Sequence, residues 1–154
     1  MDFTSKQTLD FIHRAFDEDI KDGDHSSLAS IPQGTQGKAK LLFKDEGIVA
    51  GIQLAQVILK ELDENVSFEV FKQDGDEVKY GDIGFIVTGS VHAILAGERL
   101  LLNCMQRLSG IATQTHKLVK RLGDSKSKLL DTRKTTPHLR FLEKWAVTVG
   151  GGHN

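Results

Sequence analysis

Apolar side chains recur every three or four positions in two stretches of the chain, a spacing that predicts amphipathic helices. The first helix is expected to begin at the capping-box pattern of residues 4–7 and to end near Lys21, ahead of Gly23. The second is expected to begin near Ile94 and to run for roughly 28 residues, or about 42 Å at about 1.5 Å per residue. A helix of that length is typical of a connector between two domains.

Two glycines, Gly97 and Gly110, fall inside this second helix. A glycine in a helix interior is less favourable than alanine by about 1 kcal/mol. We therefore expect Gly110 to mark close packing or a bend.

Between the two helices, short runs of β-branched and aromatic residues predict four strands and one helix. Residues 39–43 and 48–51 are expected to form a hairpin, because Gly47 in the intervening turn can adopt a positive φ. The other expected elements are a helix over residues 52–62 and strands over residues 66–70 and 84–91. Together they predict an α+β fold, in which residues 1–110 form a small α/β sandwich with a four-stranded, mixed or antiparallel sheet and a connecting helix.

The last part of the chain predicts the start of a second unit over residues 111–154. Its apolar run at Leu129 and Leu130 has the character of a short buried strand, and a helix is expected from Leu139 to about Ala146, with Pro137 in its first turn. Strand, turn and helix in this order are typical of the opening of an α/β barrel. One or two strands cannot close a barrel, so we expect an incomplete barrel and a natural polypeptide that continues.

Composition narrows the class of protein. The chain is 39% apolar and 27% charged, which is ordinary for a globular domain, and its net charge of −1 offers no global basic field for nucleic acid. No apolar run approaches the roughly 20 residues of a membrane span, and the first residues lack the basic and apolar regions of a signal peptide. We therefore expect no nucleic-acid or membrane partner and a cytoplasmic location.

Other candidate chemistry is weak. Cys104 is the only cysteine and lies among apolar residues, so we expect a buried apolar side chain rather than a reactive thiol. The acidic residues between Asp17 and Asp24 lack the spacing of a calcium loop and predict a solvated helix end. Neither glycine-rich phosphate-binding pattern is present.

The strongest candidate site is the segment Asp131-Thr132-Arg133-Lys134-Thr135-Thr136-Pro137, which follows the expected strand. Arg133 offers a planar fork of donors, Lys134 a compact charge, and the threonines supply neutral donors and acceptors. Such a set suits an anion, and the carboxyl end of a strand is where α/β sheets bind ligands. A solvated basic turn is the alternative.

Three blocks of sequence carry a resemblance. The segment Asp131 to Pro137, with Glu143-Lys144-Trp145 and the glycines before His153, resembles a signature of the quinolinate phosphoribosyltransferases, the decarboxylating enzymes of NAD biosynthesis. The runs over residues 97–103 and 106–113 are similar to a second signature of the family, and the residues Glu18-Asp19 and Gly23-Asp24 to its amino-terminal one. His138 departs from the pattern, because the family usually has glycine after the proline.

The resemblance implies substrates and roles. The substrates would be quinolinate, a pyridine dicarboxylate, and phosphoribosyl pyrophosphate with magnesium, whose ligands would fall beyond residue 154. Thr132, Arg133 and Lys134 match the family's quinolinate-binding turn, and Arg99 matches an arginine that reaches the active site of a neighbouring subunit. The resemblance thus implies a homodimer or a higher oligomer, and no residue of the chain as a catalytic nucleophile or base.

Alternatives remain at this point. Read from the residues alone, Arg99 forms a salt bridge with Glu98 or Asp82. Arg107 and Arg140 are cations on a helix surface, or cations that support the substrate-binding residues without touching the substrate. The activity could instead be that of a nicotinate phosphoribosyltransferase or a phosphorylase-like relative. The 154 residues alone could also be an inactive module that dimerises, with a mobile segment after about Gly123.

Overall fold

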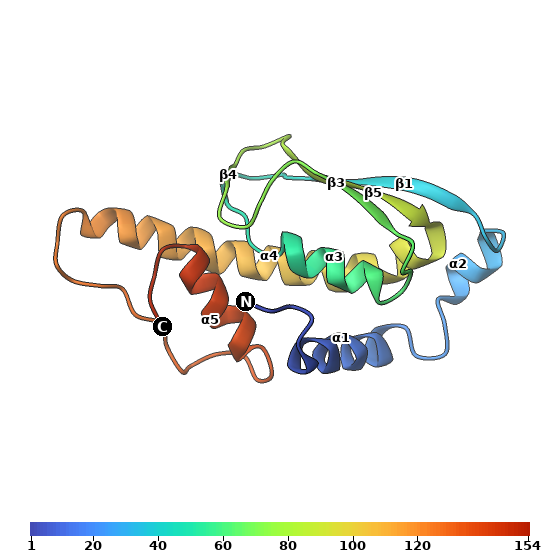
Figure 1. Cartoon of the computed structure of the whole chain (residues 1–154), viewed down its shortest axis with the longest axis horizontal. Coiled ribbons are helices and arrows are strands. Elements are labelled where there is room, and N and C mark those ends of the chain that lie inside the picture. The colour runs from blue at the N-terminus through green and yellow to red at the C-terminus, as the bar shows by residue number, and fades with distance from the viewer.

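A computed structural model describes residues 1–154. Its centre is one long helix, α4 (Val91–Leu122), which runs along most of the molecule (Figure 1). Antiparallel strands lie on one side of α4, and α3 (Ile52–Lys60) packs beside it. The helices α1 (Lys6–Asp19) and α5 (Arg140–Val149) lie on the other side. The α+β class and the long helix are therefore confirmed.

The two glycines of α4 have different surroundings. A Cβ at Gly97 would lie 2.6 Å from Leu59 Cδ2, so this glycine lets α3 pack closely against α4. A Cβ at Gly110 would meet nothing within 4 Å. The expected close packing at Gly110 is therefore wrong, and the close approach occurs about four turns earlier at Gly97.

Five strands form two separate sheets, rather than the expected single sheet of four. The first sheet has the order β1 (Gln36–Leu42), β5 (Ile83–Ser90) and β3 (Ser67–Val70), with both pairs antiparallel. The second pairs β2 (Gly47–Ile48) with β4 (Glu77–Val78), two strands of two residues each. β3, β5 and the helix α3 lie where the sequence predicted them.

The expected hairpin between residues 39–43 and 48–51 is wrong. After β1 the chain stays bonded to the turn before β5, because Phe43 donates its N–H to Asp82 O at 2.9 Å and accepts the Gly81 N–H at 2.8 Å. Ile48 instead donates its N–H to the Thr113 hydroxyl of α4 at 2.9 Å. The two runs are thus held by different partners, and alternation along the chain does not distinguish these partners.

The amino-terminal helices also differ from expectation. The capping box of residues 4–7 is not formed, because the Thr4 N–H and hydroxyl both donate to Asp2 Oδ1 and the helix begins one residue later, after Ser5. An unexpected short helix, α2 (His25–Ser30), follows. Asp24 caps it, since its carboxylate accepts both the Ser27 hydroxyl and, at 3.3 Å, the Ser27 N–H. These hydrogen bonds, the hydroxyl's first, lower the pKa of Asp24.

One hydrophobic core of 21 buried residues includes side chains from the amino terminus, both sheets, and helices α1, α3, α4 and α5. Leu142 and Ala146 bring α5 into it, with exposed fractions of 1% and 0%. Phe3 packs edge-on against Trp145 with ring centroids 4.9 Å apart, which fastens the amino terminus to α5. Residues on both sides of position 110 therefore share one core.

The segment after α4 does not form the expected strand of a barrel. Leu130 makes only an isolated parallel bridge to His153 and is 66% exposed, so the predicted burial of this run is wrong. Helix α5 begins at Arg140 and continues to Val149, past the predicted end. Pro137 therefore lies in the turn before the helix and not in its first turn. No helix has the length and apolar character needed to cross a membrane.

Candidate functional site

The segment Asp131–Pro137, which we call the cation turn, connects the Leu130 bridge to α5. Asp131 starts it, with its N–H donating to His153 O at 2.9 Å and its carboxylate paired with Lys144 of α5. Thr132 then folds the backbone back, because its hydroxyl accepts the Lys134 N–H at 3.1 Å. The start of the turn is thereby fixed by neighbours on both sides.

Arg140, the first residue of α5, holds the middle of the cation turn. Its Nη2 donates to the carbonyl oxygen of Arg133 at 3.2 Å, and its Nε donates to the Thr135 hydroxyl at 3.1 Å. Arg140 therefore supports the cation turn from the start of α5.

The end of the cation turn is held by an ion pair between Arg107 of α4 and Glu143 of α5. Arg107 of α4 donates its Nε to Glu143 Oε1 at 2.7 Å, and its Nη2 lies 2.6 Å from the same oxygen. Glu143 Oε2 accepts the Thr136 N–H at 3.3 Å, and Arg107 also donates to the Thr136 hydroxyl. Arg107 is therefore joined to the turn, though its own position is on a helix surface.

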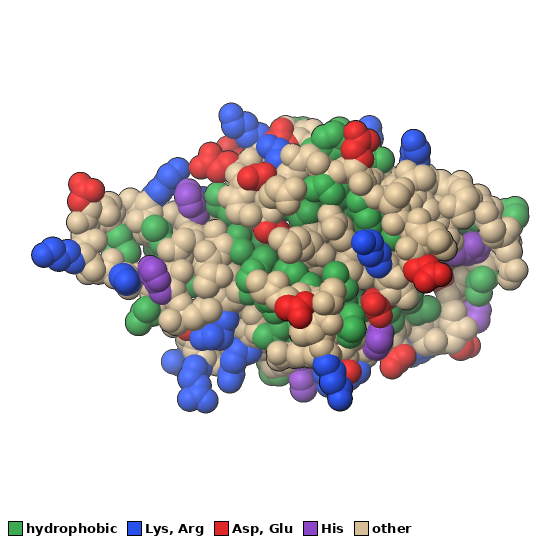
Figure 2. All heavy atoms as spheres, in the orientation of Figure 1, with side chains coloured by type: hydrophobic (Ala, Val, Ile, Leu, Met, Phe, Trp, Pro, Cys, Tyr) green, Lys and Arg blue, Asp and Glu red, His purple; other side chains and the backbone are tan.

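Arg133 and Lys134 are left free by this arrangement. Both are exposed, and neither forms an ion pair within the chain. Figure 2 shows basic side chains gathered at the lower left, over the segment that precedes α5 in Figure 1. Two adjacent free cations on a backbone tied at both ends form a preorganised site for an anion.

His138 follows the cation turn in a left-handed conformation, with φ of +64°. Residues other than glycine and asparagine rarely adopt this backbone conformation, which explains why glycine suits this position. The conformation reverses the chain just before α5, and Leu139 then donates its N–H to Thr136 O at 3.1 Å. His138 thus adopts a conformation that glycine would adopt at lower cost.

Arg99 lies elsewhere. It is on α4, about 12 Å along the helix axis from Arg107, and its side chain is 71% exposed. Its partner is Asp19 at the end of α1, whose carboxylate raises the pKa of Arg99. The expected salt bridge with Glu98 or Asp82 is therefore wrong. Within one chain, Arg99 is not brought to the cation turn.

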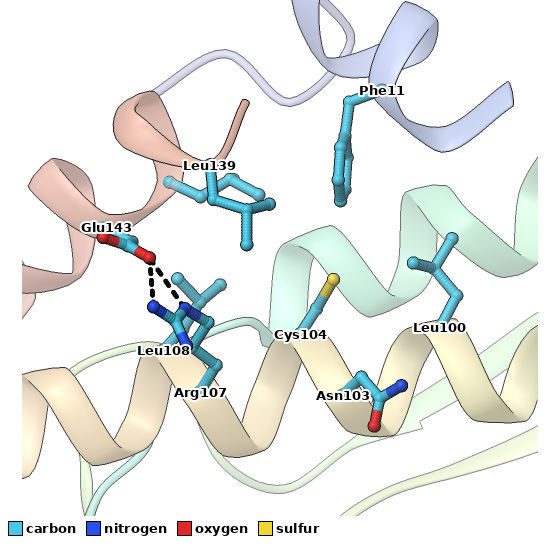
Figure 3. A pocket seen from close by; sticks show the side chains of 9 residues that line it. Phe11, Leu100, Asn103, Cys104, Arg107, Leu108, Leu139 and Glu143 are labelled. Carbon is cyan, nitrogen blue, oxygen red and sulfur yellow. Dashed lines mark hydrogen bonds and ion pairs between the residues drawn. The ribbon is translucent and has the colours of Figure 1, made fainter. Parts of the chain in front are cut away.

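A cavity of about 190 Å³ lies between α1, α4 and α5, next to the Arg107–Glu143 pair. Figure 3 shows Phe11, Leu139 and Cys104 directed toward it, with the ion pair at one side. Cys104 is buried as expected, and its burial raises the pKa of the thiol to about 12. Arg107 and Glu143 also line this cavity, and Glu143 is only 7% exposed.

Sequence reasoning quoted Glu143 only as part of the resemblance, and it read Arg107 as a cation on a helix surface or one that supports the site without touching the substrate. A usable signal was present, because Glu143 stands beside Leu142 on the apolar face of α5. No three His, Cys, Asp or Glu side chains of the chain are grouped as metal ligands.

Comparisons with known proteins agree with this geometry. The family model described as "Quinolinate phosphoribosyl transferase, N-terminal domain" matches residues 9–109, and the model of the C-terminal domain of the same family matches residues 111–154. A crystal structure of NadC from Streptococcus pyogenes superposes on 100% of this chain and 55% of that one, with a TM-score of 0.95 and 41% identity.

Curated relatives give the same result. A probable nicotinate-nucleotide pyrophosphorylase (carboxylating) of Bacillus subtilis is 45% identical over 96% of this chain and 51% of its own length. A decarboxylating quinolinate phosphoribosyltransferase of Nicotiana tabacum is 44% identical over 93% of this chain and 41% of its own length. The chain thus spans about half the length, or less, of these relatives. With its family models in chain order and its cation turn in place, the chain belongs to the quinolinate phosphoribosyl transferase family.

Proposed function

We propose that the protein transfers the phosphoribosyl group of phosphoribosyl pyrophosphate to quinolinate and releases carbon dioxide, giving nicotinate mononucleotide and pyrophosphate. The observation that carries the proposal is the cation turn, in which Arg133 and Lys134 are free while the backbone around them is tied. A pyridine dicarboxylate offers two carboxylates to such a pair, and an arginine fork matches one of them with two hydrogen bonds.

The chemistry needs alignment more than a protein nucleophile. The pyridine nitrogen supplies the electron pair that forms the bond to the sugar carbon, while the bond to pyrophosphate breaks and its electrons leave with pyrophosphate. The ring nitrogen is then cationic. Its positive charge can stabilise the carbanion left on the adjacent ring carbon when the carboxylate there departs as carbon dioxide, and a proton then binds to that carbon. Thr132, Arg133 and Lys134 would bind and orient the substrate through these steps.

Magnesium would accompany phosphoribosyl pyrophosphate in this reaction. The chain has no cluster of three potential ligands, so residues 1–154 do not fit a resident metal by themselves. We expect the ligands to lie outside this part of the protein, and no step is assigned to the metal here.

The proposal includes a homodimer in which Arg99 reaches the site of the neighbouring subunit. Its side chain is 71% exposed and lies on α4 away from the cation turn of its own chain, as an arginine acting in a second subunit would. We further propose a division of the chain after residue 110, into the α/β sandwich with its helix and the start of the catalytic barrel. The matched ranges of the two family models meet at this point. The cytoplasmic location remains a prediction, since relatives in Oryza sativa and Nicotiana glauca are named chloroplastic and mitochondrial.

The test is the affinity for quinolinate in the protein at its natural length. Arg133→Ala should weaken binding by about 2–4 kcal/mol, or roughly 30- to 900-fold, because it removes a charge-assisted contact. Arg121→Ala, which removes an exposed arginine at the end of α4, is the matched control and should bind as the wild type does. Equal affinity in the wild type and Arg133→Ala would refute the assignment.

Two other functions are separated by simple assays. The first assay supplies quinolinate that is labelled in the carboxylate next to the ring nitrogen. A nicotinate phosphoribosyltransferase or phosphorylase-like enzyme would release no labelled carbon dioxide from it. A non-catalytic dimerisation module would sediment as a dimer and show no turnover as the 154-residue chain. Turnover by that chain would contradict this last alternative.

A further inference from the structure

Glu143 is the one charged residue that the fold buries, with an exposed fraction of 7%. The other buried polar side chains are the neutral ones of Thr8, Ser27 and Thr115. Burying a carboxylate disfavours folding unless partners replace its water, and a core position beside Leu142 could hold an apolar residue instead. The presence of a charge at this position therefore calls for a role that an apolar side chain cannot fill.

The two oxygens of Glu143 have different partners. Oε1 takes both contacts from Arg107, at 2.7 Å and 2.6 Å, and Oε2 takes the Thr136 N–H at 3.3 Å. Arg107 also donates to the Thr136 hydroxyl, so each of the three residues is hydrogen-bonded to the other two. Glu143 thus joins α4 and α5 to one residue of the cation turn through hydrogen bonds that involve charged groups, and these are the stronger kind.

The position of Thr136 affects the two free cations of the turn, Arg133 and Lys134. Thr136 is two residues from Lys134 and three from Arg133, so fixing Thr136 restricts the backbone that carries both cations. Arg140 adds bonds to the carbonyl of Arg133 and to the Thr135 hydroxyl, and like Arg107 it is exposed to solvent. Glu143, by contrast, is only 7% exposed and lines the cavity together with Leu139 and Leu142, so the hydrogen bonds that it accepts are less screened by solvent than those of Arg140.

We propose that Glu143 and Arg107 are positioning residues for the anion site: they hold Thr136 and thereby keep Arg133 and Lys134 in the conformation that accepts the carboxylates of quinolinate. Neither residue touches the substrate in this account. The inference rests on the proposed function for the identity of the ligand, whereas the fixing of Thr136 depends only on the geometry of the chain.

The first experiment uses Glu143→Gln in the protein at its natural length. The variant keeps the shape of the side chain and an acceptor for Thr136, but it removes the charge that holds Arg107. The KM for quinolinate should rise about fivefold or more, while the KM for phosphoribosyl pyrophosphate and the midpoint of thermal unfolding change little. Glu64→Gln, at an exposed position without an ion pair, is the control and should change neither KM.

A pair of substitutions at Thr136 serves if Glu143→Gln does not fold. Thr136→Val removes the hydroxyl that Arg107 donates to, and Thr136→Ser keeps it. The KM for quinolinate should rise about threefold or more in Thr136→Val and return close to the wild-type value in Thr136→Ser. A rise of both KM values together with a large loss of stability would indicate a merely structural role and overturn the proposal, as would an unchanged KM for quinolinate in a folded Glu143→Gln.

The two proposals fail separately. A wild-type protein that releases no carbon dioxide from labelled quinolinate overturns the proposed function. Hydrogen exchange of the Thr136 amide, measured in the wild type and in Glu143→Gln, tests the positioning without any substrate. Faster exchange of this amide in the variant supports the positioning, and equal exchange overturns it.

Discussion

Two glycine-to-alanine substitutions should shift the stability of this protein in opposite directions. Gly110 lies in the interior of the 32-residue helix α4, with nothing within 4 Å of the Cβ that alanine would add. Gly150 follows α5 and faces α4, where an added Cβ would collide with the carbonyl oxygen of Ala112 and lie 2.7 Å from Thr115 Cβ. The same chemical change is thus made once in open space and once in a packed contact.

The magnitudes follow from these surroundings. Gly110→Ala removes the entropic penalty of a helical glycine and should stabilise the fold by about 0.5–1 kcal/mol. Gly150→Ala should destabilise it by about 1–3 kcal/mol, because the obstacle at Ala112 is backbone and α5 itself has to move. For a chain of this size, each kcal/mol changes the midpoint of thermal unfolding by about 2–4 °C.

Urea unfolding followed by two probes measures both effects. Circular dichroism at a helical wavelength reports on all helices, and the fluorescence of Trp145, the only tryptophan, reports on the contact of α5 with Phe3. Gly110→Ala should move both transitions to higher urea, and Gly150→Ala should move both to lower urea. If α5 were loosely attached, the fluorescence transition of Gly150→Ala would precede the other. A Gly150→Ala variant as stable as the wild type would refute the packing argument, and a destabilised Gly110→Ala would refute the helix argument.

Three further outcomes are expected of the chain. Leu142→Ala should destabilise the fold by about 2–5 kcal/mol in chemical denaturation, because Leu142 is 1% exposed and anchors α5 in the core. Cys104 should resist a thiol reagent at pH 8 until the protein unfolds, since a pKa of about 12 leaves about one thiolate in 10⁴. Asp63 accepts the N–H groups of Ser90 and Asn65, which lower its pKa below 3.8, so its contribution is present above that pH and lost as the pH falls toward the lower, folded pKa. Asp63→Asn should therefore lose less thermal stability than the wild type between pH 4 and pH 2, and equal losses would contradict this.

Within the candidate site, the sequence predicted the exposed cations Arg133 and Lys134, but it did not predict the contact between the residues that hold the cation turn. Arg133 and Lys134 are recognisable because two adjacent cations among threonines have a chemistry of their own. The roles of Arg107 and Glu143 depend on a contact between residues 36 positions apart, and no local pattern encodes it. Arg99 shows the same limit, because its partner Asp19 is 80 positions away.

The sequence by itself determined the helices α1, α3 and α4, the strands β3 and β5, and the location of the cation turn. These features depend on local periodicity and on residue types, which the chain carries wherever it is placed. Its short elements were beyond reach, since α2 depends on one side-chain cap at Asp24 and β4 has two residues. Tertiary structure alone decided which backbone groups pair: Ile48 bonds to Thr113 of α4 rather than to the preceding strand, and α5 packs into the same core as the sheets. The physical reason is that buried backbone and charged groups must find partners, and those partners come from elements far apart in the sequence.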